Sequence, residues 1–150
     1  MFTVITRFAE PGDLGQIMEL YRILIPDDLK EDPERLEKVW KDIMSHRDRY
    51  RYVVAEEDGR LLSTCNIVIV PNLTRSARPY AVIENVVTRP EARMRGLGRA
   101  CLTKAIEFAK ENGCYKIMLL SGSKRLDAHK FYESLGFSGD KKKGFVIEYL

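Results

Sequence analysis

Residues 82–102 read VIENVVTRPEARMRGLGRACL, and they carry the clearest structural pattern in the chain. The β-branched, apolar run at their start predicts a strand that stops before Pro90. A short loop at 93–98, RMRGLG, is basic and contains two glycines. After it, apolar residues at helical spacing predict a helix that reaches Asn112 and is stopped by Gly113. The segment therefore predicts a strand, a basic glycine loop and a helix N-terminus in succession.

The loop at 93–98 has the chemistry expected of a phosphate-binding site. A helix N-terminus presents unpaired N–H groups and the positive end of the helix dipole, so anions bind there. The two glycines let a phosphate approach the backbone closely. Arg93, Arg95 and Arg99 add guanidinium groups, which can bind phosphate oxygens in pairs. The alternative interpretation is a solvated basic turn that precedes a helix.

Two motifs in the chain resemble those of a known family. The dinucleotide fingerprint and the P-loop are absent, and Cys101 stands where the third glycine of the dinucleotide fingerprint would fall. The loop instead reads R-x-x-G-x-G, which resembles the acetyl-CoA signature of the GNAT superfamily of N-acetyltransferases. Residues 128–137, AHKFYESLGF, resemble the A-x-x-F-Y-x-x-x-G-F element that occurs late in the same family. The resemblance covers residues 80–150 and is weaker before them.

The composition limits the organisation of the chain and its partners. A length of 150 residues predicts a single domain over residues 1–150, and a net charge of +3 predicts neither a nucleic-acid nor a membrane partner. The three cysteines are odd in number and lack metal-ligand spacing, which indicates a reducing, cytoplasmic compartment and no metal site. No apolar run approaches the ~18 residues of a membrane helix, and the N-terminus does not resemble a signal peptide.

The hydrophobic pattern predicts a fold of the α+β class. The expected core is a mixed, mostly antiparallel sheet of six to seven strands, flanked by about four helices in three layers. This layout is the acyl-CoA N-acyltransferase fold that the resemblance to the GNAT superfamily implies. Asp13 and Gln16 resemble a capping box at the start of the first helix. The expected strands are 2–7, 50–55, 61–70, 80–88 and 114–120, with short ones around Phe137 and at 145–149, and the expected helices are 14–24, 33–44, 98–112 and 126–135.

The resemblance implies transfer of an acetyl group from acetyl-CoA to a primary amine. The amine of a small molecule or a protein attacks the thioester directly, with no acyl-enzyme and no metal. Dimers are frequent in the family, and an exposed C-terminal strand would support a homodimer. The pantetheine arm of the cosubstrate runs along the strand before the loop and pairs with its backbone. The CoA-binding residues that follow from the resemblance are Val86, Val87, Thr88, Arg93, Met94, Arg95, Gly96, Leu97, Gly98 and Arg99.

Glu84 is the predicted general base. Alternate side chains of a strand share a face, which places Glu84 with Val82 and Val86. A carboxylate in such an apolar row is partly desolvated, so its pKa is expected to rise toward neutrality, as suits a base working near pH 7. The family often has an acidic residue at this position, which acts directly or through water. The alternative is a solvent-facing or salt-bridged glutamate, and a bulge, common in this strand of the family, would break the argument.

Tyr132 is the predicted general acid, because it matches the tyrosine that lies near the CoA sulfur in this family. A phenol with a pKa of ~10 can give a proton to a thiolate of similar basicity. The alternative is a core aromatic residue beside Phe131. The family often has a pantetheine-contacting asparagine seven residues earlier, where this chain has Arg125, which could reach a phosphate instead.

Two further functional alternatives stay open at this point. The segments VIENVV and NGCYKIMLL look like those of glucosamine-6-phosphate acetyltransferases, and basic turns such as 141–143 would suit a sugar phosphate. A non-catalytic, acetyl-CoA-binding regulatory module is the second alternative, and the presence of both Glu84 and Tyr132 argues against it. Nucleic-acid binding is not expected, because the charge is nearly balanced and no basic helix is present.

Overall fold

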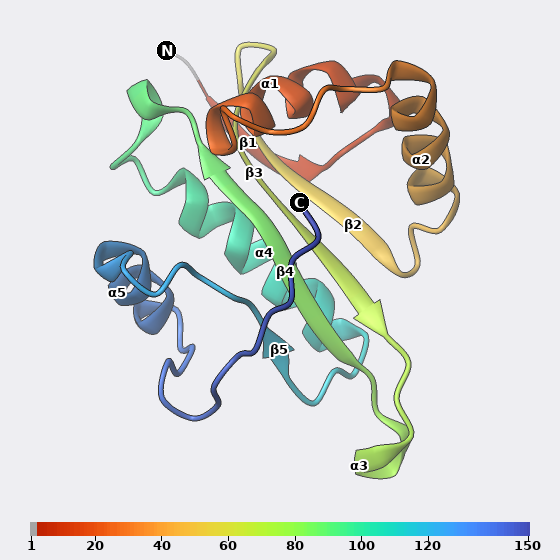
Figure 1. Ribbon diagram of the computed structural model, residues 1–150, viewed down its shortest axis with the longest axis vertical. Coiled ribbons are helices and arrows are strands. Elements are labelled where there is room, and N and C mark those ends of the chain that lie inside the picture. The colour runs from red at the N-terminus through yellow and green to blue at the C-terminus, as the bar shows by residue number, and fades with distance from the viewer. Residues whose placement is uncertain (1–2) are drawn as a thin grey trace. The chain divides into compact units, whose positions relative to one another are not determined.

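The computed structural model describes residues 3–150, which form two compact units, one ending at Met118 and one starting at Leu119 (Figure 1). Residue 2 of the first expected strand lies outside the described residues, and the single domain expected over residues 1–150 stays a prediction. None of the described helices combines the length and the apolar composition needed to cross a membrane.

The elements of the first unit are β1 (Val4–Phe8), the 3-10 turn η1 (Pro11–Asp13), α1 (Leu14–Leu24), α2 (Pro33–Ser45), β2 (Tyr50–Glu57), β3 (Arg60–Val70), α3 (Thr74–Ala77), β4 (Tyr80–Thr88), the 3-10 turn η2 (Pro90–Ala92), α4 (Leu97–Glu111) and β5 (Ile117–Met118). The second unit contains α5 (Leu126–Ser134).

The sheet of the first unit is mixed and mostly antiparallel, as the hydrophobic pattern predicts. Its order is β1-β2-β3-β4-β5, and every pair is antiparallel except β4 with β5. The predicted number of strands is wrong, because residues 3–150 form five rather than six to seven. The expected strand at 114–120 shortens to Ile117–Met118, and no strand forms around Phe137 or at 145–149. Residues 145–149 are exposed, and a strand-forming composition gives a strand only where another strand pairs with it.

Helices cover both faces of this sheet, because neighbouring residues of a strand point to opposite sides. Val54 and Val87 belong to the apolar cluster that α1 and Trp40 of α2 complete on one face. On the other face, Phe108 of α4 makes an edge-to-face contact with Phe8, with 5.8 Å between the ring centroids. Figure 1 shows α4 passing behind β4, against which it packs. The sheet thus lies between α1 and α2 on one side and α4 on the other.

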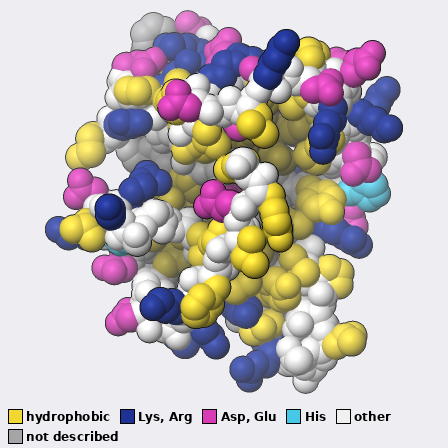
Figure 2. Space-filling model, viewed as in Figure 1, with side chains coloured by type: hydrophobic (Ala, Val, Ile, Leu, Met, Phe, Trp, Pro, Cys, Tyr) yellow, Lys and Arg dark blue, Asp and Glu magenta, His cyan; other side chains and the backbone are white. Residues whose placement is uncertain are grey.

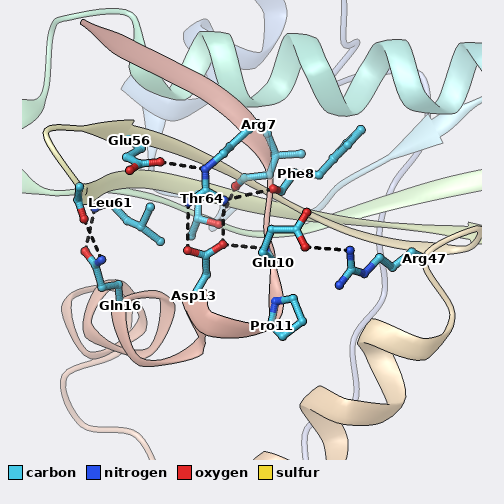
Figure 3. Close-up of polar contacts among 12 residues, drawn as sticks. Arg7, Phe8, Glu10, Pro11, Asp13, Gln16, Arg47, Glu56, Leu61 and Thr64 are labelled. Carbon is cyan, nitrogen blue, oxygen red and sulfur yellow. Dashed lines mark hydrogen bonds and ion pairs between the residues drawn. The ribbon is translucent and has the colours of Figure 1, made fainter.

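Ion pairs join the edge strand β1 to the turn before α1 (Figure 3). The Arg7 guanidinium donates to both carboxylate oxygens of Asp13, at 2.8 and 3.0 Å, and its Nε donates to Glu56 at 2.8 Å. Asp13 also accepts a hydrogen bond from the backbone N–H of Glu10. The predicted capping box of Asp13 with Gln16 is wrong, because the Gln16 side chain bonds the backbone of the β2–β3 hairpin instead.

Asp13→Asn is expected to lower the free energy of unfolding at pH 7 by about 1–3 kcal/mol, because the partly buried Arg7 loses one of its two carboxylate partners. The Arg7 hydrogen bond lowers the pKa of Asp13 in the folded protein. The contribution of Asp13 is therefore complete above its unfolded pKa of about 3.9, and it is lost as the pH falls through the lower, folded pKa. In urea titrations the stability gap between wild-type protein and variant should narrow below about pH 4.

The exposed Asp27 provides the matched control for this experiment. Asp27→Asn is expected to change the free energy of unfolding by less than about 0.5 kcal/mol. A gap for Asp13→Asn that stays constant into the acid range would show that this carboxylate does not owe its contribution to the Arg7 pair.

Candidate active site

The loop between β4 and α4, called the basic loop (residues 93–98), exposes backbone N–H groups and arginine side chains. Met94 and Gly96 adopt left-handed conformations, with φ of 63° and 76°, and such residues help direct successive N–H groups into one concave face. The first helical hydrogen bond of α4 runs from the Ala100 N–H to the Gly96 carbonyl, and no side chain of the described residues caps the helix. The N–H groups of Leu97 and Gly98 have no acceptor within the helix and are available to an anion. The arginines at 93, 95 and 99 are exposed, and Figure 2 shows basic side chains near the start of α4.

Arg89, the residue after β4, fixes the base of the basic loop. Its side chain is buried, its Nε donates to the Leu61 carbonyl at 2.8 Å, and its Nη2 donates to Glu19 of α1 at 2.8 Å. Its backbone N–H also donates to the Leu62 carbonyl at 2.8 Å. A buried guanidinium held by a carboxylate and a carbonyl restrains the backbone that carries it. Sequence reasoning missed this residue, because its side-chain partners lie 28 and 70 positions away.

Arg95 of the basic loop pairs with Glu57 at the end of β2. Its two terminal nitrogens donate to the two carboxylate oxygens, Nη1 to Oε1 at 3.4 Å and Nη2 to Oε2. The carboxylate of Glu57 raises the pKa of Arg95, so the guanidinium is charged and already engaged. On the same hairpin, Arg60 pairs with Glu91 of η2 at 2.9 Å. A phosphate that binds Arg95 must therefore compete with Glu57.

A bulge interrupts the pairing of β4 with β3. Asn66 lies opposite Glu84, but Thr64 lies opposite Val87, so β4 carries one residue more than β3 over this span. Asn85 lies within the bulge and has a φ of 52°, a left-handed conformation that asparagine adopts more readily than most residues. An asparagine within the run VIENVV is the signal from which the sequence could have indicated this irregularity.

The bulge changes the expected surroundings of Glu84. Val82 shares its face, as predicted, but the register places Val87 on that face in place of Val86, so this part of the prediction is wrong. Glu84 is also exposed, and the apolar row that was expected to desolvate its carboxylate does not cover it. The carboxylate is therefore accessible from solvent. Its role as the general base stays a prediction.

One edge of β4 is unpaired next to the bulge. β5 pairs only with Ala81 and Val82, and no other described strand lies along that side of β4. Along residues 83–88 the backbone groups on that side can therefore pair with an extended ligand that carries amides. Val86 is half-buried, whereas the side chain of Val87 belongs to the apolar core. The predicted contact of this segment with CoA would therefore use its backbone N–H and C=O groups rather than its side chains.

Tyr132 belongs to the second unit, where it lies on α5. Its side chain is buried and contacts the rings of Phe131 and Phe137, with centroids 5.4 and 6.2 Å away. Arg125 occupies the N-cap position of α5 and is exposed. This packing agrees with the alternative of a core aromatic residue. The role of Tyr132 as the general acid stays a prediction.

The buried cysteines have raised thiol pKa values. Burial raises the pKa of Cys101 to about 12 and raises the pKa of Cys65 well above its ordinary value. Cys101 lies near the start of α4, where the helix dipole alone would lower a thiol pKa, so burial is the stronger effect. Within residues 3–150, no group of three or more His, Cys, Asp or Glu side chains is placed to hold a metal ion.

Comparison with known proteins identifies the family. The sequence model of the Acetyltransferase (GNAT) family matches residues 17–137. The chain belongs to the GNAT family. A glucosamine 6-phosphate N-acetyltransferase of Trypanosoma brucei brucei is 38% identical to this GNAT protein over 85 residues, which cover 57% of this chain and 56% of the relative. The matched region thus spans little more than half of that relative.

Solved structures confirm the GNAT fold over nearly the whole chain. A structure from Agrobacterium tumefaciens str. C58 has a TM-score of 0.89 and 43% sequence identity, and the match covers 97% of this chain and 99% of that one. The glucosamine-6-phosphate N-acetyltransferase of Arabidopsis thaliana has a TM-score of 0.84 and 25% identity, covering 98% of each chain. The family membership predicted from the segments 93–98 and 128–137 is confirmed.

In this GNAT protein, Glu57→Gln is expected to bind acetyl-CoA about two- to fivefold more tightly at low ionic strength, because Arg95 no longer has to leave a carboxylate. Isothermal titration calorimetry measures the change, which should shrink at high salt because the Arg95 guanidinium is exposed to solvent. Glu91→Gln is the matched control, since it breaks the Arg60 pair without touching an arginine of the basic loop. An unchanged or weaker affinity of Glu57→Gln would show that Glu57 does not compete for Arg95.

Proposed function

We propose that this GNAT protein transfers the acetyl group of acetyl-CoA to a primary amine of a small molecule or a protein. Members of the family bind acetyl-CoA or CoA. The observation that supports the proposal most directly is the continuous path from the open edge of β4 through the exposed basic loop to the uncapped start of α4. These features suit the amides and the diphosphate of one cosubstrate.

In this proposal the basic loop receives the diphosphate of CoA. Backbone N–H groups at the start of α4 bind phosphate oxygens, and the exposed guanidinium groups add charge. The pantetheine arm pairs with the backbone of β4 along its open edge. This pairing explains how Val87 can contact CoA although its side chain lies in the core. The residues assigned to CoA are Val86, Val87, Thr88, Arg93, Met94, Arg95, Gly96, Leu97, Gly98 and Arg99.

The reaction forms one bond and breaks one bond. The amine nitrogen attacks the thioester carbonyl carbon, a C–N bond forms, and the C–S bond breaks with release of the CoA thiolate. Glu84 takes the proton that the amine loses, directly or through water, and Tyr132 gives a proton to the thiolate. The carboxylate of Glu84 is accessible to an amine from solvent, and the motif at 128–137 supports the role of Tyr132.

A phosphorylated amino sugar is the acceptor that the relatives favour. Both the Trypanosoma relative and the Arabidopsis structure are named glucosamine 6-phosphate N-acetyltransferases. A non-catalytic module that only binds acetyl-CoA would keep the basic loop and release no CoA thiol, so the assay below separates the two functions.

Acetyl-CoA is expected to raise the melting temperature of the protein, and the double variant Arg93→Ala, Arg95→Ala is expected to lose most of this shift, because two phosphate-binding cations are removed. The control double variant, Lys141→Ala with Lys142→Ala, removes the same charge from an exposed turn and should keep the shift. Release of CoA thiol over a panel of amines that includes glucosamine 6-phosphate measures turnover. Binding without thiol release on any amine would favour the regulatory module.

Glu84→Gln and Tyr132→Phe are each expected to lower kcat at pH 7 by about 10²-fold or more, since each removes a proton-transfer group. The affinity for acetyl-CoA, measured separately, should change little. Glu34→Gln and Tyr149→Phe are matched controls, because both side chains are exposed and neither has a role in the proposed reaction. Full turnover of either catalytic variant across the pH range would remove that residue from the mechanism.

A further inference from the structure

Two polar side chains of α1 bond the ends of the strands that flank the basic loop. Gln16 and Glu19 are three positions apart, so they share one face of the helix. The half-buried Gln16 accepts from the Leu61 N–H at 2.8 Å through Oε1 and donates to the Gly59 carbonyl at 3.0 Å through Nε2. Glu19 accepts from Nη2 of Arg89 at 2.8 Å. One face of α1 thus holds both the start of β3 and the residue that follows β4.

Leu61 connects Gln16 with Arg89. Its N–H bonds Gln16 and its carbonyl accepts from Nε of Arg89, both at 2.8 Å, so the two peptide groups that flank its Cα are held. Leu61 is buried, and a buried backbone group that loses its partner gains no water in exchange. Arg89 is therefore restrained by α1 twice, once through Glu19 and once through Gln16 and Leu61.

The stretch between Arg89 and the basic loop is short and internally bonded. Pro90 fixes one backbone dihedral angle, and the Ala92 N–H donates to the Arg89 carbonyl at 2.9 Å. The Arg93 N–H donates to the Pro90 carbonyl at 3.4 Å, and Ala92 is buried. A displacement of Arg89 is therefore passed on to the basic loop rather than absorbed before it.

We propose, on the basis of the CoA binding proposed above, that Gln16 and Glu19 are positioning residues for the cosubstrate. They act through Arg89 and do not touch CoA. Hydrogen bonds from backbone N–H groups weaken steeply when their direction or length is wrong, so the affinity of the basic loop for a diphosphate depends on where its backbone is held. Helix α1 thus sets this geometry from the face of the sheet opposite α4.

The test measures the Kd of two ligands by calorimetry, acetyl-CoA and ADP, which carries a diphosphate but no pantetheine arm. Gln16→Leu removes both hydrogen bonds of the side chain and is expected to raise both Kd values about three- to tenfold. The value of kcat at saturating acetyl-CoA should stay within about twofold of wild type, because the reacting groups are untouched.

Variants of Glu19 test the same inference through the sign of the change. Removal of a carboxylate strengthens the binding of an anionic ligand if charge alone acts. Glu19→Leu is nevertheless expected to raise both Kd values about three- to tenfold, because Arg89 loses a partner that holds it. Glu19→Gln keeps an oxygen that can accept from Arg89 and should bind at least as tightly as wild type.

Asn72→Leu is the matched control for Gln16→Leu. The Asn72 side chain also bonds backbone, at the carbonyls of Thr74 and Arg78, but it lies beyond the other end of β3. This variant should lower the melting temperature and leave both Kd values unchanged. Lower melting temperatures of Gln16→Leu and Glu19→Leu with wild-type Kd values would assign both side chains to folding alone and overturn the inference.

The inference and the proposed function can fail separately. Raised Kd values in the two leucine variants support the inference even where no amine is acetylated and the proposed function fails. Unchanged Kd values overturn the inference, and release of CoA thiol by the wild-type protein then leaves the proposed function intact. Wild-type protein that binds neither acetyl-CoA nor ADP would overturn both.

Discussion

The left-handed backbone at Asn85 is the constraint on which the geometry of β4 depends. The extra residue in the bulge shifts the register against β3, so that Val87 and not Val86 joins the core beneath α1. Bulges bend a strand and increase its local twist, and the pairing of β4 with β5 ends before the bulge is reached. The open edge of β4, the position of Val87 and the placement of Glu84 beside Asn66 all lie at this one irregularity.

The arginine residues around the basic loop differ in burial, and the difference gives Arg89 a structural role and leaves Arg95 able to change its partner. Arg89 is buried and bonded to a carbonyl and a carboxylate, and breaking such a pair would leave an uncompensated charge out of water. Arg95 is exposed and its partner Glu57 is half-buried, and an ion pair with one side in solvent contributes little to stability. The base of the loop is therefore fixed, whereas the guanidinium at its tip can exchange one anion for another. A binding loop needs this combination, because a rigid backbone presents the N–H groups while the side chains adapt.

The parts of the structure that the sequence predicted are those that depend on neighbouring residues. The succession of β4, the basic loop and α4 follows from local hydrophobic pattern, glycines and helix signals, and it is present as predicted. The strands expected around Phe137 and at 145–149 needed a partner edge, which no local pattern specifies, and they did not form. The resemblance to the family raised the possibility of a bulge in this strand, but the residues alone did not place it, because register is set by the facing strand. The roles of Arg89 and Glu57 depend on contacts 28 to 70 positions apart, which periodicity does not reveal.

Buried polar residues of the first unit differ in whether their polar atoms are hydrogen-bonded. Around Asp13, every carboxylate oxygen faces a donor from Arg7 or from the backbone, which is the arrangement expected where a polar group serves the fold. Around the bulge, Tyr21 and Asn66 each keep a buried atom unpaired, although a phenylalanine or a leucine would fill similar space without that penalty. The two groups lie within one sheet and one set of helices, and only the group that holds β1 in place has all of its carboxylate oxygens paired.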